Sequence, residues 1–170
     1  MSHFIRIVLI VLLLAAAVLV WTELKVKQEV EQPDEIQDVV QTTHISLKGV
    51  ELGVTSPTVD SVVTSPLTIT GEAPGTWYFE ATFPVTLVNW DGRIIAEGYA
   101  TAQGEWMTEK MVPFTAMLEF TDVLPLTEEV EDLTQVEDFM KRGALILQRD
   151  NPSGLPENDD AVEFQIQFAE

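Results

Sequence analysis

The sequence of 170 residues contains no cysteine. This absence excludes disulfide bonds, thiolate metal sites, cysteine nucleophiles and the lipid-carrying cysteine of a bacterial lipoprotein. It leaves the compartment open, because an exported domain of this size has a core large enough to fold without disulfides.

Histidine is nearly absent: His3 lies beside an apolar segment and His44 lies further along the chain. There is no HExxH zinc motif, serine elbow, P-loop or dinucleotide fingerprint. A Ser-His-Asp hydrolase would require His44 to fold back onto the domain. Another possible enzyme is a hydrolase that uses a pair of carboxylates alone. With 28 acidic residues in the sequence, however, some pair lies at a workable spacing by chance. We therefore predict that the protein is not an enzyme and needs no cofactor.

Basic residues are scarce, with 9 Lys and Arg against 28 Asp and Glu, which gives a formal net charge of -19. An acidic surface repels phosphate backbones, so the composition predicts no nucleic-acid partner. It also disfavours lying flat on an anionic bilayer. Divalent cations and basic proteins would be attracted instead.

One long apolar run is present, over residues 4–21, with Arg6 as its charge and Trp21 at its far end. It is long enough to cross a bilayer as a helix if Arg6 snorkels. The competing reading is a cleaved signal peptide, with Ala15, Ala16 and Ala17 as the small-residue cleavage site. Residues 1–22 are thus predicted to be a transmembrane anchor or signal segment.

Orientation rests on the order of the N-terminal segments. Positive charges flank the apolar run on both sides, so they do not decide it. The short N-terminal tail favours an N-terminus that stays in the cytoplasm. We expect a single-pass membrane protein whose C-terminal domain is extracytoplasmic, or a secreted protein if the segment is cleaved.

Residues 23–46 are acidic and interrupted by Pro33, which predicts a linker extended by self-repulsion. A short amphipathic helix over residues 23–32 is the alternative. Residues 47–170 are predicted to form the folded domain.

The domain sequence alternates between apolar and polar residues at the period of a β-strand. Asp91-Gly92 marks a hairpin, and Pro84 indicates a bulge or an unpaired edge. Alternation places Phe79 and Phe164 in the core. Strands are predicted over residues 50–54 (an edge strand), 67–71, 77–88, 94–101, 114–120, 143–148 and 162–168. About seven strands joined by turns favour an antiparallel β-sandwich over an α/β fold.

Residues 122–142 break the pattern with an acidic insertion, in which we predict a short helix from about Gln135 to Arg142. This segment is expected either to pack over one end of the sandwich or to dock onto a basic partner. Its acids at 128, 129, 131 and 132 are the ones that docking would use.

Several segments resemble the immunoglobulin-like domain associated with bacterial spore germination proteins, often called the Gmad type. The matching pieces are residues 63–71 (VTSPLTITG), 77–83 (WYFEATF), Asp91-Gly92, Glu105-Trp106 and Pro113-Phe114. The resemblance covers about residues 50–120, and the acidic insertion departs from it. It implies an all-β, immunoglobulin-like module outside the cytoplasm with no recognised catalytic residues, and it implies no particular ligand.

Two groups of residues are candidate sites. Trp90, Tyr99 and Trp106 offer an aromatic surface for a protein or glycan partner, with covering of the sandwich end as the alternative. Asp150, Asn151, Asp159 and Asp160 supply oxygen ligands for a weak calcium site, although their spacing fits no ordered ligand series and turn chemistry is the competing reading.

The predicted function is protein interaction or spacing in the bacterial cell envelope, by a non-catalytic, membrane-anchored module. The alternative is a module that binds glycan or peptidoglycan through exposed aromatic side chains. In either case the predicted partner is an envelope protein or a glycan.

Overall fold

The structure is a computed structural model that describes residues 41–121, 123 and 136–169. They belong to a compact unit over residues 40–170. Among the described residues no helix is long and apolar enough to cross a membrane. The apolar run over residues 4–21, and most of the acidic insertion, lie outside them.

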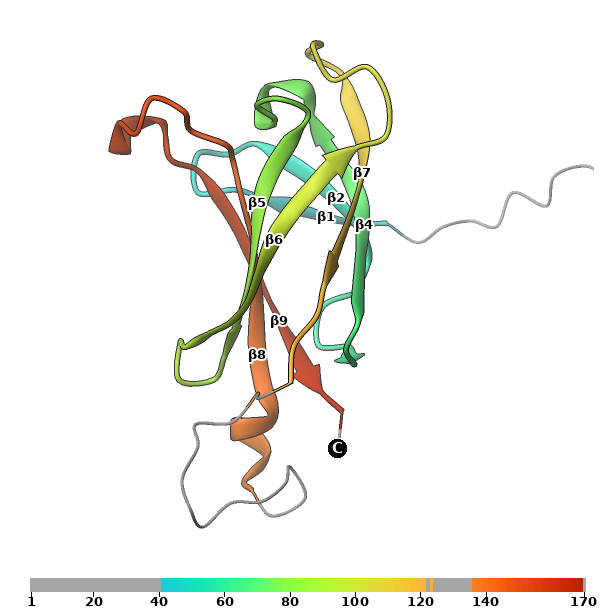
Figure 1. The fold of residues 1–170 in the computed structure, drawn as a ribbon, viewed down its shortest axis with the longest axis vertical. Coiled ribbons are helices and arrows are strands. Elements are labelled where there is room, and N and C mark those ends of the chain that lie inside the picture. Colours follow the sequence, from blue (N-terminus) through green and yellow to red (C-terminus); the bar gives the residue numbers. More distant parts are fainter. Residues whose placement is uncertain (1–40, 122, 124–135, 170) are drawn as a thin grey trace, which may run out of the picture. The chain divides into compact units, whose positions relative to one another are not determined.

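The described chain is all β, with nine strands and three short 3-10 helices (Figure 1). The strands are β1 (Thr42–Ile45), β2 (Glu51–Ser56), β3 (Val62–Val63), β4 (Leu67–Pro74), β5 (Thr82–Asn89), β6 (Ile94–Ala102), β7 (Met111–Leu118), β8 (Arg142–Gln148) and β9 (Ala161–Phe168). The helices are η1 (Gly75–Trp77), η3 (Asp138–Lys141) and η4 (Pro156–Asn158).

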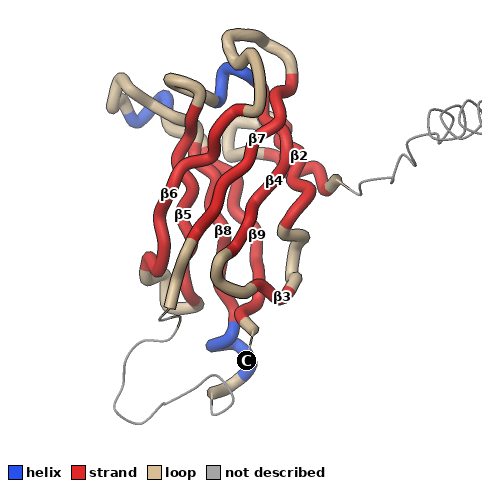
Figure 2. The backbone as a smooth tube through the Cα atoms, turned by 45° about the vertical axis from the view of Figure 1, so that its right-hand side comes forward, coloured by secondary structure: helices blue, strands red, loops and turns tan. Residues whose placement is uncertain are grey.

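The strands are hydrogen-bonded in the order β1-β2-β4-β7-β6-β5-β8-β9-β3. The pairing between β6 and β7 comprises only Thr101 with Thr115 and Ala102 with Phe114, so the sheet turns there from one layer to the other. The first layer holds β1, β2, β4 and β7, and the second holds β6, β5, β8, β9 and β3. Figure 2 shows β4 and β7 across from β8 and β9. The fold is therefore β-sandwich-like, as predicted.

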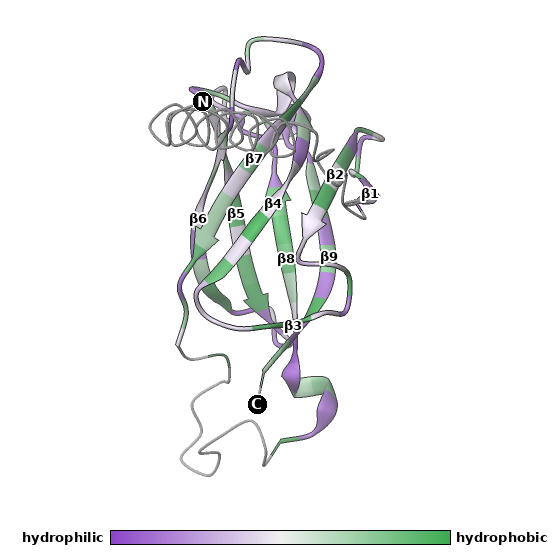
Figure 3. Ribbon diagram, turned by 90° about the vertical axis from the view of Figure 1, so that its right-hand side faces the viewer, coloured by the Kyte–Doolittle hydropathy of each residue, from purple (hydrophilic) through white to green (hydrophobic). Residues whose placement is uncertain are grey.

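The core lies between the two layers and is built by period-two alternation. In β7 every second residue is buried, and β9 follows the same pattern. The central strands β5 and β8 are largely hydrophobic along their length (Figure 3). Phe83 of β5 meets Phe114 of β7 edge to face, with ring centroids 5.0 Å apart, and so joins the layers. The alternation predicted for β7 and β9 is confirmed.

The start of the predicted strand 77–88 is wrong. η1 and a tight turn occupy residues 75–81, and β5 begins only at Thr82. Glu80 and Ala81 have φ of 49° and 65°, which reverses the chain and ends the alternation. As a result Phe79 is 43% exposed, whereas Tyr78, predicted to face outward, is buried and donates a hydrogen bond to the Val112 carbonyl.

Two smaller predictions have different outcomes. In β5, Pro84 pairs with Tyr99 of β6 but lies one residue before the β8 pairing starts at Val85, so it is an unpaired edge, as predicted, on its β8 side alone. In the β5–β6 pair the register shifts between Leu87 and Val88 of β5, so that Ile94 of β6 lies opposite Val88. Ile94 is consequently 53% exposed, and its neighbour Ile95 packs against the core instead.

The N-terminal edge of the fold is β1, which includes residues assigned from the sequence to the linker. β1 pairs with β2, so β2 is not the edge strand that we expected. His44 on β1 stacks on Phe164 of β9 at 4.5 Å between ring centroids. His44 therefore does fold back onto the domain.

A buried polar cluster fixes the β1–β2 turn to β9. The Ser46 hydroxyl donates to the Asp160 carboxylate at 2.7 Å and accepts from the Val50 amide at 2.9 Å. Asp160 also accepts from the Lys48 amide at 3.1 Å. Because Ser46 and Asp160 are both buried and both hydrogen-bonded, the cluster is a structural tie between strands distant in sequence.

Candidate functional site

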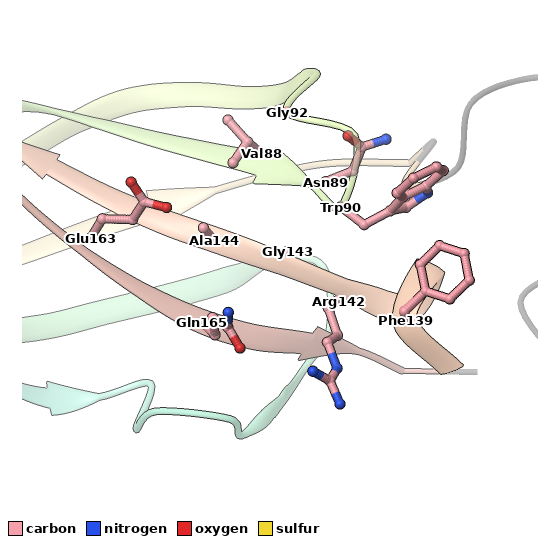
Figure 4. Close-up of a pocket in the computed structure, with 10 residues that line it drawn as sticks. All are labelled: Val88, Asn89, Trp90, Gly92, Phe139, Arg142, Gly143, Ala144, Glu163 and Gln165. Carbon is pink, nitrogen blue, oxygen red and sulfur yellow. The ribbon is translucent and has the colours of Figure 1, made fainter. Parts of the chain in front are cut away.

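The outer face of the second layer carries a hollow of about 380 Å³ at the end of β5. We call it the Trp90 hollow. It is lined by Val88, Asn89, Trp90 and Gly92 from β5 and its hairpin, by Phe139, Arg142, Gly143 and Ala144 from η3 and β8, and by Glu163 and Gln165 from β9 (Figure 4).

The floor of the Trp90 hollow is a row of paired residues across three strands. Val88 lies opposite Ala144, and Ala144 lies opposite Gln165. Gly143 lies next to this row, where a Cβ atom would meet the Val88 carbonyl oxygen at 2.5 Å and the Phe168 ring at 2.7 Å. The small side chain of Ala144 keeps the floor low, and Gly143 lets β5 approach β8 closely.

The wall of the hollow is an aromatic pair. Trp90 and Phe139 meet edge to face at 5.2 Å between ring centroids, with an interplanar angle of 89°. Trp90 is 37% exposed and Phe139 is 52% exposed, so both rings keep free surface. Figure 4 shows them side by side beyond the ends of the strands. Exposed, paired aromatic rings are typical of interaction surfaces.

Asn89 holds the hairpin that carries Trp90. Its buried side-chain oxygen accepts hydrogen bonds from the Asp91 amide at 3.1 Å and the Arg93 amide at 2.9 Å. Its side-chain nitrogen donates to the Val123 carbonyl at 3.2 Å. Trp90 is therefore presented from a rigid turn, with Gly92 at a φ of 76° that glycine adopts without strain.

Polar side chains at the hollow are free to bind. Within the described part of the chain, the side chains of Arg142, Glu163 and Gln165 form no hydrogen bond or salt bridge. They place a guanidinium, a carboxylate and an amide around an apolar floor. Such a combination binds a partner through apolar contact and fixes its orientation through a few polar contacts.

The three aromatic residues predicted as one surface do not gather at one place. Trp90 is in the β5–β6 hairpin, Tyr99 is opposite Pro84 near the other end of β5, and Trp106 is in the β6–β7 loop. Tyr99 is 64% exposed, whereas Trp106 is half-buried and packs against the core.

The four residues predicted as a calcium site have separate structural roles. Asp160 is tied to Ser46 in the interior, and the Asn151 side-chain nitrogen donates to Asp159 at 2.6 Å. Burial, followed by repulsion from Glu80, raises the pKa of Asp150. In the described residues no group of three or more His, Asp and Glu side chains is placed to hold a metal ion.

His44, Ser46 and Asp160 lie near one another on β1 and its contact with β9, but they do not form a catalytic relay. The Ser46 hydroxyl bonds directly to Asp160, with no imidazole between them. His44 Nε2 is buried and has no hydrogen-bond partner among the described residues. Desolvation by burial lowers the pKa of His44, so the ring is neutral at pH 7.

Sequence reasoning identified Trp90 but missed its partners. The sequence predicts that Phe139 belongs to a short helix that either packs over one end of the sandwich or docks onto a basic partner, and the structure has a 3-10 helix over Asp138–Lys141 there. Gln165 and Arg142 had not been considered. The sequence signal for Phe139 is an aromatic residue in an otherwise polar segment immediately before a strand.

Comparison with known proteins yields one match. Residues 51–132 match the family described as "Immunoglobulin-like domain of bacterial spore germination". No curated protein and no solved structure matches the chain. The match begins at β2 and ends within the acidic insertion, so β8 and β9 complete the sandwich beyond it. The match confirms, over residues 51–132, the resemblance that the sequence segments indicated.

Proposed function

We propose that this protein is a non-catalytic, membrane-anchored interaction module on the outer side of the bacterial cytoplasmic membrane, and that its partner docks at the Trp90 hollow. The observation that carries the proposal is the exposed Trp90–Phe139 pair at the edge of a small-residue floor. Family membership supports an interaction module, because immunoglobulin-like domains commonly present loops and sheet faces to partners.

A protein partner fits this surface better than a flat sugar ring does. The edge-to-face geometry uses part of one ring's face for the other ring, so the pair offers a ridge instead of a stacking platform. The other predicted aromatic residues, Tyr99 and Trp106, lie elsewhere and add nothing to a platform. Beside the floor, Ile94 opposite Val88 is 53% exposed and extends the apolar contact area.

Charge selects the kind of protein. The chain has a net charge of -19, and this field accelerates association with a basic partner and repels acidic ones. At the hollow, Glu163 and Arg142 carry opposite charges with no hydrogen bond or salt bridge in the described chain, so the preference for a basic partner rests on the charge of the whole chain. The proposed partner is therefore a basic segment of an envelope protein that carries at least one apolar side chain for the aromatic ridge.

Anchoring and orientation rest on residues 4–21 and the short N-terminal tail. Their test is protease added to spheroplasts, which should remove the region after Lys27 while cytoplasmic proteins stay intact. A domain that resists digestion in spheroplasts but is digested after lysis would place it in the cytoplasm and contradict this part of the proposal.

Site-specific photo-cross-linking in intact cells tests the docking surface. A photoreactive phenylalanine analogue is introduced at Phe139, and the matched control carries it at Phe79, which is 43% exposed at the opposite end of β5. We expect a discrete adduct with a basic envelope protein from position 139 only. Trp90→Ala should reduce its yield about tenfold, because interface aromatic residues are frequently hot spots.

Two results would contradict the docking proposal. One is the same adduct from positions 79 and 139, which would indicate contact without a defined surface. The other is an adduct from position 139 whose yield is unaffected by Trp90→Ala and by added salt, because screening should weaken recognition of a basic partner.

A further inference from the structure

A second hollow lies where the chain passes from the first layer to the second and back. It has a volume of about 460 Å³ and lies between the end of β2, the segment around β3 and the start of β4. Figure 2 shows the loops that flank β3 beside β4. It shares no lining residue with the Trp90 hollow. Six of its lining residues carry hydroxyl groups: Thr55, Ser56, Thr58, Ser61, Thr64 and Thr68.

Most of these hydroxyl groups have no hydrogen-bond partner among the residues that the structure describes. Ser61 donates to the Thr58 carbonyl at 2.7 Å. The other five hydroxyl groups form no hydrogen bond within the described residues. Each hydroxyl can donate one hydrogen bond and accept two, so the hollow offers many unused donors and acceptors in a small space.

The remaining lining residues are apolar. Pro57, Val63 and Leu67 are buried, whereas Val62 and Pro66 are exposed at the rim. None of the lining residues is charged, although 22% of the residues in the sequence are. This uncharged hollow is exceptional on a chain with a net charge of -19.

The hollow is preformed by backbone hydrogen bonds. The Asp60 amide donates to the Gln165 carbonyl at 2.8 Å, and the Gln167 amide donates to the Ser61 carbonyl at 2.9 Å. On the other side, Ser56 pairs with Thr70. Because both walls are fixed to strands, a ligand would not have to order the site, and that saves conformational entropy on binding.

We propose that this hydroxyl hollow binds a segment of an uncharged carbohydrate. A charged ligand would lose hydration here and gain no opposite charge. A purely apolar ligand would cover the free hydroxyl groups and leave them unsatisfied. A neutral sugar avoids both costs, because its hydroxyl groups complement those of the protein and its C–H faces contact valine and proline.

The test is saturation-transfer difference NMR with the full chain in lipid nanodiscs and empty nanodiscs as the blank. The neutral probes are the tetrasaccharides of N-acetylglucosamine and of glucose. Their charged counterparts are the tetramers of glucosamine and of glucuronic acid. We expect at least one neutral probe to bind, with Kd at least tenfold lower than that of either charged counterpart.

Variants locate the site. Thr58→Val with Thr64→Val removes two partnerless hydroxyl groups at constant shape, and Thr115→Val on the outer face of β7 is the matched control. Two lost hydrogen bonds should weaken binding of the neutral probe roughly tenfold or more. The control variant should bind as the native chain does.

Several results would overturn the inference. One is the absence of saturation transfer to either neutral probe up to about 10 mM, which corresponds to negligible affinity. Another is unchanged binding of the neutral probe by the double variant. A third is a charged tetramer that binds as tightly as the neutral probe. Loss of sugar binding in Trp90→Ala would also overturn it, because the sugar would then occupy the Trp90 hollow. The inference does not depend on the proposed function, since a protein adduct at position 139 can form whether or not the hydroxyl hollow binds sugar.

Discussion

Phe164 and Phe79 allow the packing of the sandwich to be tested with the same chemical change at two positions. Phe164 is 6% exposed and stacks on His44 at 4.5 Å, whereas Phe79 is 43% exposed in the turn before β5. Phe→Ala in a core costs about 3–5 kcal/mol through lost burial and the cavity left behind. At Phe79 the loss should be below about 1.5 kcal/mol, because much of the ring is already in water.

The turn at Phe79 should survive the substitution. The Phe79 amide donates to the Thr82 carbonyl at 2.9 Å, and the Thr82 amide donates to the Phe79 carbonyl at 3.1 Å. Alanine at position 79 retains both backbone hydrogen bonds. For a unit of this size, the expected fall in Tm is roughly 10–20 °C for Phe164→Ala and at most about 5 °C for Phe79→Ala.

Urea and thermal unfolding of residues 40–170, followed by tryptophan fluorescence, measures both changes. Trp77 is 1% exposed and reports loss of the core. An unchanged m value would confirm that both variants unfold from the same compact state. Equal losses at the two positions, or a loss below about 1 kcal/mol at Phe164, would refute the assignment of inner and outer positions.

Three further predictions concern polar groups. Because burial lowers the pKa of His44, the folded state binds fewer protons than the unfolded state, so stability should fall as pH drops below about 6.5. Urea titrations at pH 7.5 and 5 should show a smaller fall in the His44→Phe variant. The pKa of Asp150 is raised, so the opposite sign applies: Asp150→Asn should stabilise the domain at pH 7, and its advantage should shrink as the native carboxyl becomes protonated at acid pH. Asn89→Ala should cost about 2–4 kcal/mol by thermal unfolding, because it leaves the hairpin amides without their acceptor, and Asn89→Asp should recover part of the loss.

The sequence predicted the strands whose alternation continues unbroken. β7 and β9 alternate over their full length, and their inward residues are buried as expected. Alternation fails before β5, because Glu80 and Ala81 adopt positive φ although neither is a glycine or an asparagine. No local sequence signal marks that reversal. It depends on how η1 and the turn fit against the rest of the fold.

β1 was missed for a different reason. Four residues after an acidic stretch bury little surface by themselves, and the strand exists because β2 and Phe164 are available to pair with it. At the candidate site, Trp90 could be predicted from a tryptophan beside an Asp-Gly hairpin. Its contact with Phe139 could not, because only the pairing of β5 with β8 brings these two chain segments together.

The groups that hold the fold together and the groups proposed to bind partners are different sets of residues. At the Trp90 hollow, Asn89 is buried and uses its side chain to fix the hairpin, whereas the neighbouring Trp90 is exposed and meets the exposed ring of Phe139. At the hydroxyl hollow, backbone bonds from Asp60 and Ser61 to β9 fix the walls, and the partnerless hydroxyl groups carry no structural task. A rigid frame with replaceable surface side chains lets recognition change while the core stays constant. For this reason fold membership alone cannot identify the ligand, and the exposed residues at the two hollows are where relatives with different partners should differ.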